Sequence, residues 1–349
     1  MQNSYHLNES FWYLNKQTNK IDMKTKLLAV MATLGMVASA SAVKINNNIS
    51  INGFIDGSYV TTDNDNTNRD DSNLQLDEVE LNILVNAGNV SGELHIDSTD
   101  SGELSVGDGA ASNDSNEQEL NIEQVHFSYA FGNGASLQVG RFGSELGLER
   151  EDPAGLYTFS RAYNNDFDLG NVDSFVQEGA RLAYSTGAFA GSVALYNAIG
   201  DIEDNNGSKN DLDYEVALSY TGFDNLTIGA GIQTVRPTDG NNTEVYTLNV
   251  AYTLDKLLLA AEYTNIEEDN VDHSGYLVLA DYDVNEKLGL AVRYSQWETD
   301  DAGAESEKIT FAPNYAITES LGAIIEFSAE EEADGDEIDS FAVELTYTF

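Results

Sequence analysis

The chain has 349 residues, of which 16 are Lys or Arg and 60 are Asp or Glu, giving a formal net charge of −44. This charge argues against DNA or RNA as a partner, because nucleic-acid binding needs a basic surface. The sequence contains no cysteine, which excludes disulfides, thiolate metal sites and cysteine nucleophiles. Apolar residues make up 41% of the chain, enough for a folded protein rather than a disordered acidic tail.

Residues 23–42 have the three parts of a secretory signal peptide. A basic start at Met23–Lys26 precedes the apolar run 27–38, and Ala40-Ser41-Ala42 provides a small-residue cleavage site. The run is too short for a transmembrane helix, which needs roughly 20 apolar residues. We expect cleavage after Ala42 and export of the remainder.

Residues 1–22 are polar and show no periodic pattern. We expect them to be an upstream extension that is not translated, with the true start at Met23. A peptide from residues 1–22 in the mass spectrum of the native protein would contradict this. The exported part, residues 43–349, has 349 − 42 = 307 residues. Four lysines and two acidic residues precede it, so it carries 16 − 4 = 12 basic and 60 − 2 = 58 acidic side chains.

The exported part alternates between apolar and polar residues with a period of two almost throughout. In the last segment Phe341, Val343, Leu345 and Tyr347 alternate with small, polar or charged residues such as Glu344. This period is typical of β-strands with one apolar face. We predict sixteen strands, near residues 47–60, 74–87, 90–98, 118–131, 135–143, 174–186, 188–198, 212–221, 225–236, 244–253, 256–265, 275–283, 287–297, 308–316, 320–329 and 338–349.

The connections between these segments alternate strictly between short and long. Seven are tight, such as Gly88-Asn89 and Thr186-Gly187, and are expected to be hairpin turns. All long loops then fall at one end of the sheet, and the short turns and both termini fall at the other. The eight longer connections, mostly acidic, lie near 61–73, 99–117, 144–173, 199–211, 237–243, 266–274, 298–307 and 330–337.

This combination predicts an all-β fold, a transmembrane antiparallel up-and-down β-barrel of about 16 strands with long outer loops and short periplasmic turns. A membrane requires a closed barrel, because an open edge would leave backbone groups unpaired in lipid. A soluble β-sandwich gives no reason for alternating loop lengths, and a β-solenoid should show a fixed repeat. Pro313 does not fit, since it lies inside a predicted strand and a closed barrel has no free edge to receive it.

One stretch resembles the β-barrel porin-2 family of Gram-negative outer-membrane porins. It comprises Val139-Gly140-Arg141-Phe142, Leu146-Gly147-Leu148-Glu149, Phe159-Ser160-Arg161-Ala162-Tyr163 and Glu178-Gly179-Ala180-Arg181. The resemblance implies an outer-membrane location, contact with lipid and lipopolysaccharide, and a terminal Phe349 read by the barrel-assembly machinery. Likeness to trimeric porins further implies a homotrimer whose third long loop, here 144–173, folds inward and narrows the channel.

Charged residues of this loop and of the inward phase of the strands are the candidates for a constriction. Opposed arginines and carboxylates would create a transverse field that sets selectivity. The alternative is that the arginines neutralise the acidic residues of the loop and hold it in place. The candidates are Arg141, Glu145, Glu149, Arg150, Glu151, Arg161, Asp166, Asp168, Arg181, Glu215, Glu262, Arg293, Glu326 and Glu344. Other carboxylates assigned to the inward phase are Glu93, Asp97, Glu244 and Asp281.

Two kinds of chemistry receive weaker support. The acidic loops, for example residues 330–337, supply oxygen ligands for Ca²⁺ or Mg²⁺, but they lack EF-hand spacing and a solvated outer face explains them better. Ser128 lies two residues from His126 on one face, a candidate pair for a barrel hydrolase. Same-face neighbours on a strand are roughly 6–7 Å apart, too far for direct activation.

The sequence thus predicts an outer-membrane porin, a passive diffusion channel for small hydrophilic solutes with a preference for cations and no catalytic activity. Sixteen strands leave an aqueous lumen, whereas eight-stranded barrels are filled by side chains. The alternative is a structural or adhesive barrel that binds partners through its acidic outer loops, and a barrel hydrolase is the third reading.

Overall fold

The computed structural model describes residues 42–65, 69–99, 103–105, 117–119, 121–149, 153–162, 176–197, 212–235, 243–268, 271–299 and 304–349. The expected untranslated extension 1–22 and nearly all of the expected signal peptide 23–42 lie outside these ranges and remain predictions. Among the described residues, no helix is long and apolar enough to span a membrane. The one helix described is a single 3₁₀ turn, η3, at Pro153–Gly155.

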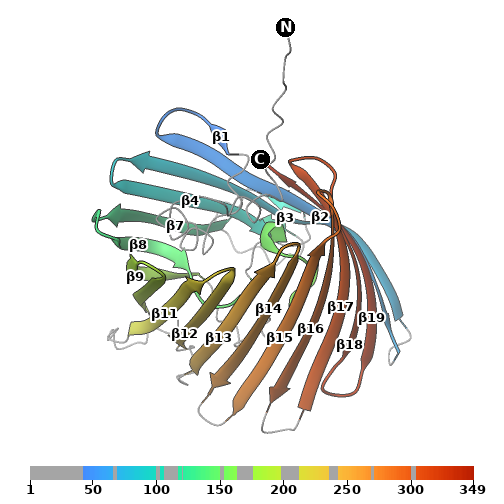
Figure 1. The fold of residues 1–349 in the computed structure, drawn as a ribbon. Helices are drawn as coiled ribbons and strands as arrows, with labels where there is room; N and C mark the ends of the chain where they lie inside the picture. The colour runs from blue at the N-terminus through green and yellow to red at the C-terminus, as the bar shows by residue number, and fades with distance from the viewer. Residues whose placement is uncertain are drawn as a thin grey trace, which may run out of the picture.

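Sixteen long strands form one closed antiparallel barrel (Figure 1). Each strand pairs with its neighbours in sequence, and pairing of the last strand with the first closes the ring. They are β2 (Ile49–Asn64), β3 (Arg69–Ala87), β4 (Val90–Thr99), β7 (Asn121–Ala130), β8 (Ala135–Gly143), β9 (Val176–Thr186), β10 (Phe189–Asn197), β11 (Leu212–Phe223), β12 (Leu226–Val235), β13 (Thr243–Leu254), β14 (Leu257–Glu267), β15 (Asp272–Asp283), β16 (Leu288–Thr299), β17 (Ala304–Ala316), β18 (Leu321–Glu331) and β19 (Glu337–Thr348).

All sixteen predicted strands are confirmed, most within about three residues of their expected ends. The largest difference is the β2–β3 hairpin, which extends to the rung Asn64↔Arg69. Its added rungs join polar residues such as Asp63 and Asp70, so no hydrophobic alternation marks them. Three short strands were not predicted: β1 (Val43–Lys44), which pairs with β2, and the parallel pair β5 (Glu103–Ser105) and β6 (Glu117–Glu119).

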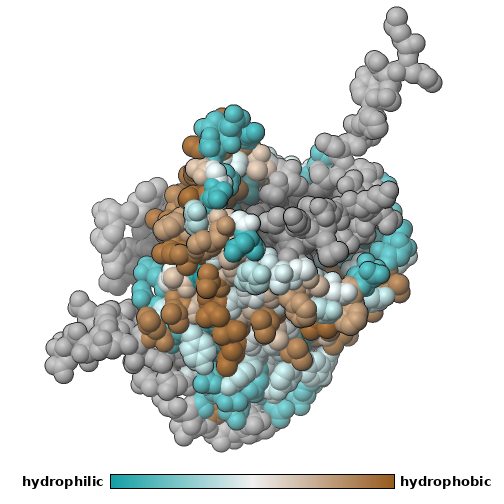
Figure 2. All heavy atoms as spheres, turned by 60° about the vertical axis from the view of Figure 1, so that its left-hand side comes forward, coloured by the Kyte–Doolittle hydropathy of each residue, from teal (hydrophilic) through white to brown (hydrophobic). Residues whose placement is uncertain are grey.

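The barrel carries its apolar residues outside and its polar residues inside. On β19, Leu345 and Tyr347 are 48% and 45% exposed, whereas Glu344, which precedes Leu345, is 2% exposed. Figure 2 shows hydrophobic residues gathered across the middle of one outer face, with hydrophilic residues above and below them. This distribution is that of a barrel whose outer surface faces lipid and whose inner wall is polar.

Glycines in left-handed conformations form two of the predicted tight turns. Gly88 and Gly187 have φ of 68° and 60°.

Pro313 lies within β17, directly across from Leu290 of β16. On its other side, the pairing with β18 skips Ala312 and Pro313 and resumes in the same register at Asn314. The predicted strand is therefore correct, and a local gap in the ladder accommodates the missing N–H group.

Candidate functional site

The long connection between β8 and β9 lies against the inner wall of the barrel. Its described part, residues 144–149 and 153–162, makes contacts with inward-facing side chains of β11, β16 and β18. In Figure 1 this green segment, with its short 3₁₀ turn, lies within the ring of strands. The contacts occur in three groups, around Arg293, around Arg181 and Glu215, and at Glu326.

Arg293 of β16 is fully buried and holds the loop at three residues. Its Nη1 donates hydrogen bonds to Glu149 Oε1 at 2.8 Å, to Thr158 Oγ1 at 2.8 Å and to the Ser160 carbonyl at 2.6 Å. Its Nη2 donates to Ser160 Oγ at 2.9 Å. The second carboxylate oxygen of Glu149 accepts a hydrogen bond from the Ala162 amide at 2.8 Å. One ion pair therefore fixes both ends of the segment 149–162.

Arg181 of β9 and Glu215 of β11 form the second group, at the start of the loop. Arg181 Nη2 lies 3.2 Å from Glu215 Oε1 and Nη1 lies 3.6 Å from Glu145 Oε1. The Glu215 carboxylate also accepts hydrogen bonds from Ser144 Oγ at 2.6 Å and from the Glu145 amide at 3.2 Å. The Arg181 guanidinium stacks over the Phe142 ring, 4.5 Å from its centroid. Two acidic residues thus share one buried arginine.

Glu326 of β18 forms the third group. Its Oε2 accepts hydrogen bonds from the amides of Phe159 and Ser160, at 2.7 and 3.1 Å. These donors belong to a loop backbone that has no strand partner, so the buried carboxylate takes the place of a β-ladder. The three groups place loop residues against strands that lie far apart along the sequence.

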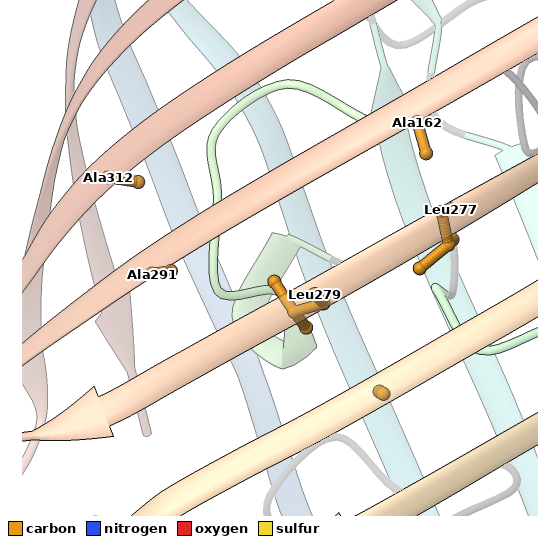
Figure 3. Packing of buried hydrophobic residues seen from close by; sticks show 6 residues of the cluster. Ala162, Leu277, Leu279, Ala291 and Ala312 are labelled. Carbon is orange, nitrogen blue, oxygen red and sulfur yellow. The ribbon is translucent and has the colours of Figure 1, made fainter.

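An apolar pad on the inner wall lies beneath the loop. Ala162 packs with Leu277 and Leu279 of β15, together with Ala291 of β16 and Ala312 of β17 (Figure 3). Leu148 and Tyr157 of the loop pack against the same cluster. Burial raises the pKa of the Tyr157 phenol to about 12, and the nearby carboxylates of Asp281 and Asp283 act in the same direction. Tyr157 is therefore a neutral packing group at physiological pH.

These inward leucines were missed by the sequence analysis, although a signal for them exists. The run Tyr276-Leu277-Val278-Leu279-Ala280 is apolar on both faces of β15, whereas most strands alternate. Tyr276 and Val278 are exposed on the outer surface, and Leu277 and Leu279 are buried inside. A strand that is apolar on both faces is typical of burial on both faces.

The remaining candidates divide into placed and undescribed residues. Glu262 of β14 and Glu344 of β19 are buried on the inner wall, and Glu262 lies near Asn249, whose Nδ2 is 3.5 Å from Glu262 Oε2. Arg161 lies in the loop beside Ala162. Arg150, Glu151, Asp166 and Asp168 fall outside the described residues.

Two of the charged candidates lie in the outward phase of their strands: Arg141, a candidate because it is at the end of its strand, and Glu244, which was predicted to face inward. Arg141 pairs directly with Val125, which is exposed on the outer surface, and its Nε donates to the Glu123 carbonyl at 2.8 Å. Glu244 shares its face of β13 with the exposed Leu248, whereas Val245 next to it is buried. In both cases the local alternation decides the face, and a charged residue near a strand end lies at the polar rim rather than in the apolar belt.

The candidate hydrolase pair His126 and Ser128 is not joined by a hydrogen bond among the described contacts. His126 Nε2 instead lies 3.8 Å from Glu93 Oε2.

The acidic loop after β18 brings three carboxylates together. Oxygens of Glu332, Asp334 and Asp336 approach one another within 4.8 Å. Burial and the other acidic side chains raise the pKa of Glu332. All three ligand atoms are oxygens, the type that Ca²⁺ and Mg²⁺ prefer. Binding of either ion at this loop remains a prediction.

The fold is shared with several solved porin structures. The outer membrane channel DcaP of Acinetobacter baumannii superposes with a TM-score of 0.62 at 11% identity, over 88% of this chain and 100% of that one. An anion-selective porin from Comamonas acidovorans gives 0.61 at 12%, over 86% and 99%. The trimer form of the outer membrane protein OmpT of Vibrio cholerae gives 0.57 at 11%, over 87% and 100%.

Sequence comparison gives a family rather than a single relative. Among proteins with curated descriptions, none matches this sequence. The model of the family described as beta-barrel porin-2, OmpL-like, matches residues 48–344, which is nearly the whole barrel. The match, the closed sixteen-stranded barrel and the shared porin fold agree with one another. The chain therefore belongs to the beta-barrel porin-2 family and is an outer-membrane channel protein.

Proposed function

We propose that this channel allows passive diffusion of small hydrophilic solutes, that the loop 144–173 constricts it, and that it prefers cations. The observation that carries the proposal is the fully buried Arg293, which binds Glu149, Thr158 and Ser160 of the loop from the opposite part of the inner wall. A loop held in this way reduces the open cross-section of the lumen.

The positions of the anchors around the ring support a constriction. The loop leaves β8, and its residues Phe159 and Ser160 bind Glu326 on β18. The shorter way around the ring from β8 to β18 runs through β7, β4, β3, β2 and β19. It is six strand-to-strand steps in a ring of sixteen strands. A segment that joins positions so far apart on a closed ring crosses its interior rather than following the wall.

The charge of the inner wall supports a preference for cations. Arg181 and Arg293 are its buried arginines among the described residues, and each is paired with carboxylates of the loop or wall. Because both arginines are neutralised by carboxylates, we assign them the role of holding the loop rather than of creating an electric field across the lumen. The buried inward carboxylates outnumber them; they are Asp56, Glu80, Asp97, Asp213, Glu215, Glu262, Asp281, Glu326 and Glu344.

Single-channel recordings test this proposal. In planar bilayers with asymmetric KCl, the protein should give stepwise openings and a reversal potential displaced toward the potassium equilibrium potential, because acidic walls concentrate cations. Glu262→Gln should reduce that displacement, since it removes a buried carboxylate of the inner wall. Glu319→Gln, a change of the same kind in the exposed turn between β17 and β18, is the control. Openings with an anion-directed reversal potential would contradict the cation preference.

The alternatives make different predictions in the same preparation. A structural or adhesive barrel would insert stably and carry no current, and its acidic loops would then be examined as a binding surface. A barrel hydrolase would release product from ester or peptide substrates, and Ser128→Ala would abolish that release.

We also propose a homotrimer, since the solved structures of the same fold include one described as a trimer form. Native mass spectrometry of the protein extracted in detergent should give three times the chain mass, and a single-chain mass would contradict it. Contacts with lipopolysaccharide and recognition of Phe349 by the barrel-assembly machinery remain predictions.

A further inference from the structure

Five glutamate and histidine side chains, all of types that bind metals, gather on the inner wall formed by β3, β4 and β7. Glu80 comes from β3, Glu93 and His95 come from β4, and Glu123 and His126 come from β7. Glu80 and His95 are 0% and 4% exposed. One nitrogen or oxygen of Glu80, His95 and Glu123 can be chosen so that all three atoms lie within 4.8 Å of one another.

The two ring nitrogens of His95 face different partners. Nε2 lies 3.3 Å from Glu93 Oε2, a long hydrogen bond. Nδ1 lies 3.4 Å from Glu80 Oε1 and 3.9 Å from Glu123 Oε2. All three distances lie beyond the range of about 2.7–3.2 Å for ordinary N–H···O hydrogen bonds. The two distances on the Nδ1 side are the longest of the three.

This arrangement is the one expected around a metal ion. A ligating histidine commonly donates its other ring N–H to a carboxylate, which fixes the ring and leaves the first nitrogen free to coordinate. In a tetrahedral site with ligand bonds of about 2.1 Å, neighbouring ligand atoms lie about 3.4 Å apart. The separation of His95 Nδ1 from Glu80 Oε1 has this value. The distance from His95 Nδ1 to Glu123 Oε2 is 3.9 Å. A small rotation of the partly exposed Glu123 side chain would shorten this distance to about 3.4 Å.

His126 provides an independent observation. Its side chain is 8% exposed, and its Nδ1 is buried with no hydrogen-bond partner among the described residues. Its ring centroid lies 6.4 Å from that of His95. A buried imidazole nitrogen without a hydrogen-bond partner is costly. The other nitrogen of this ring, Nε2, lies 3.8 Å from Glu93 Oε2.

We propose that Glu80, His95 and Glu123 bind one divalent first-row transition-metal ion in the wall of the channel. Glu93 is a positioning residue that orients His95, and His126 is available as a further ligand. Imidazole with carboxylate ligands suits Zn²⁺ and its neighbours in the series, whereas an all-oxygen set would suit Ca²⁺ or Mg²⁺. A divalent cation would also offset the repulsion among the carboxylates of Glu80, Glu93 and Glu123.

Zinc binding to the whole protein tests this proposal. The chain is extracted in detergent, stripped of metal with a chelator and equilibrated by dialysis with micromolar ZnCl₂, and bound zinc is measured by elemental analysis. We expect one zinc per chain. Glu93→Gln should weaken the affinity by about 10- to 100-fold, the usual effect of losing a partner of a ligand. His95→Gln and Glu123→Gln should weaken it further, since each removes a ligand.

The matched control is His273→Gln. His273 stacks on Trp297 near the outer end of β15, with ring centroids 5.7 Å apart, and its loss should leave the stoichiometry unchanged. Absorption of bound Co²⁺ gives a second readout, and its bands should disappear in His95→Gln. A slower gel mobility on boiling verifies that each variant is folded, and Glu123→Gln substitutes for His95→Gln if that variant does not fold. Occupancy far below one, or equal occupancy in wild type and His95→Gln, would overturn the proposal. Neither readout depends on ion conduction.

Discussion

Replacing Arg293 with methionine is expected to raise the single-channel conductance and to make the current noisy, because the loop loses its main anchor. Methionine keeps much of the length but leaves the Glu149 carboxylate buried without its partner. Loss of one member of a buried ion pair costs about 3–5 kcal/mol in proteins. Even 3 kcal/mol raises the ratio of detached to docked loop by about 100-fold, since each 1.4 kcal/mol is about tenfold.

Two further variants distinguish loss of the loop anchor from loss of one positive charge as the cause of a higher conductance. Lys308→Met also removes one positive charge, but it breaks a pair between two barrel strands, since Lys308 Nζ lies 3.0 Å from Glu330 Oε2. Its conductance should stay near that of wild type. Adding Glu149→Gln to Arg293→Met removes the unpaired buried charge and should restore part of the docked population. An Arg293→Met channel with unchanged conductance would contradict the constriction by the loop.

The strands and their closure were predictable because a barrel imposes the same period of two on every segment. Outward residues such as Leu345 must contact lipid, and inward residues such as Glu344 must not, so the sequence records the face of each position. Turn positions were predictable for a separate reason. Residues such as Gly88 and Gly187 adopt φ values that favour glycine.

The docking of the loop was not predictable from the same pattern. Ser144, Glu149 and Ser160 follow no regular period, and their partners Glu215, Arg293 and Glu326 lie on distant strands. The sequence identified Glu149, Glu215, Arg293 and Glu326 individually as charged candidates, but it could not pair them. Pairing depends on the path of an irregular segment along the inside of the barrel, which local propensity does not determine.

The motif shared with the porin-2 family gains a physical explanation from these contacts. Its glycines Gly140 and Gly179 lie directly opposite each other in the β8–β9 ladder. Its Phe142 and Arg181 stack on the inner wall, and its Glu149 binds Arg293. The motif therefore describes the wall beside the loop and the ion pair that holds the loop to Arg293.

The second large effect is expected at Gly140, where alanine should prevent the native barrel from forming. Gly140 has φ of 138°, a conformation that side chains with a Cβ rarely adopt. A Cβ there would clash with the Val125 carbonyl oxygen and would lie 2.6 Å from His126 Cα. Both atoms belong to the backbone of β7, so relief requires the β7–β8 pairing to shift. The backbone strain alone costs about 1–3 kcal/mol.

Gly92→Ala is the matched control, because it makes the same change on β4, the other strand that pairs with β7. A Cβ at Gly92 would meet only the His126 carbonyl oxygen, at 3.6 Å, an ordinary van der Waals distance. Each variant is refolded in detergent, and the fraction of compact barrel is read from gel mobility before and after boiling. Gly92→Ala should refold as wild type does, whereas Gly140→Ala should give mostly unfolded chain. Equal refolding of the two variants would show that the β7–β8 ladder tolerates a side chain at Gly140. Because β8 leads directly into the loop, the same ladder positions Ser144 and Glu145 against Glu215, so its loss would also release the start of the loop.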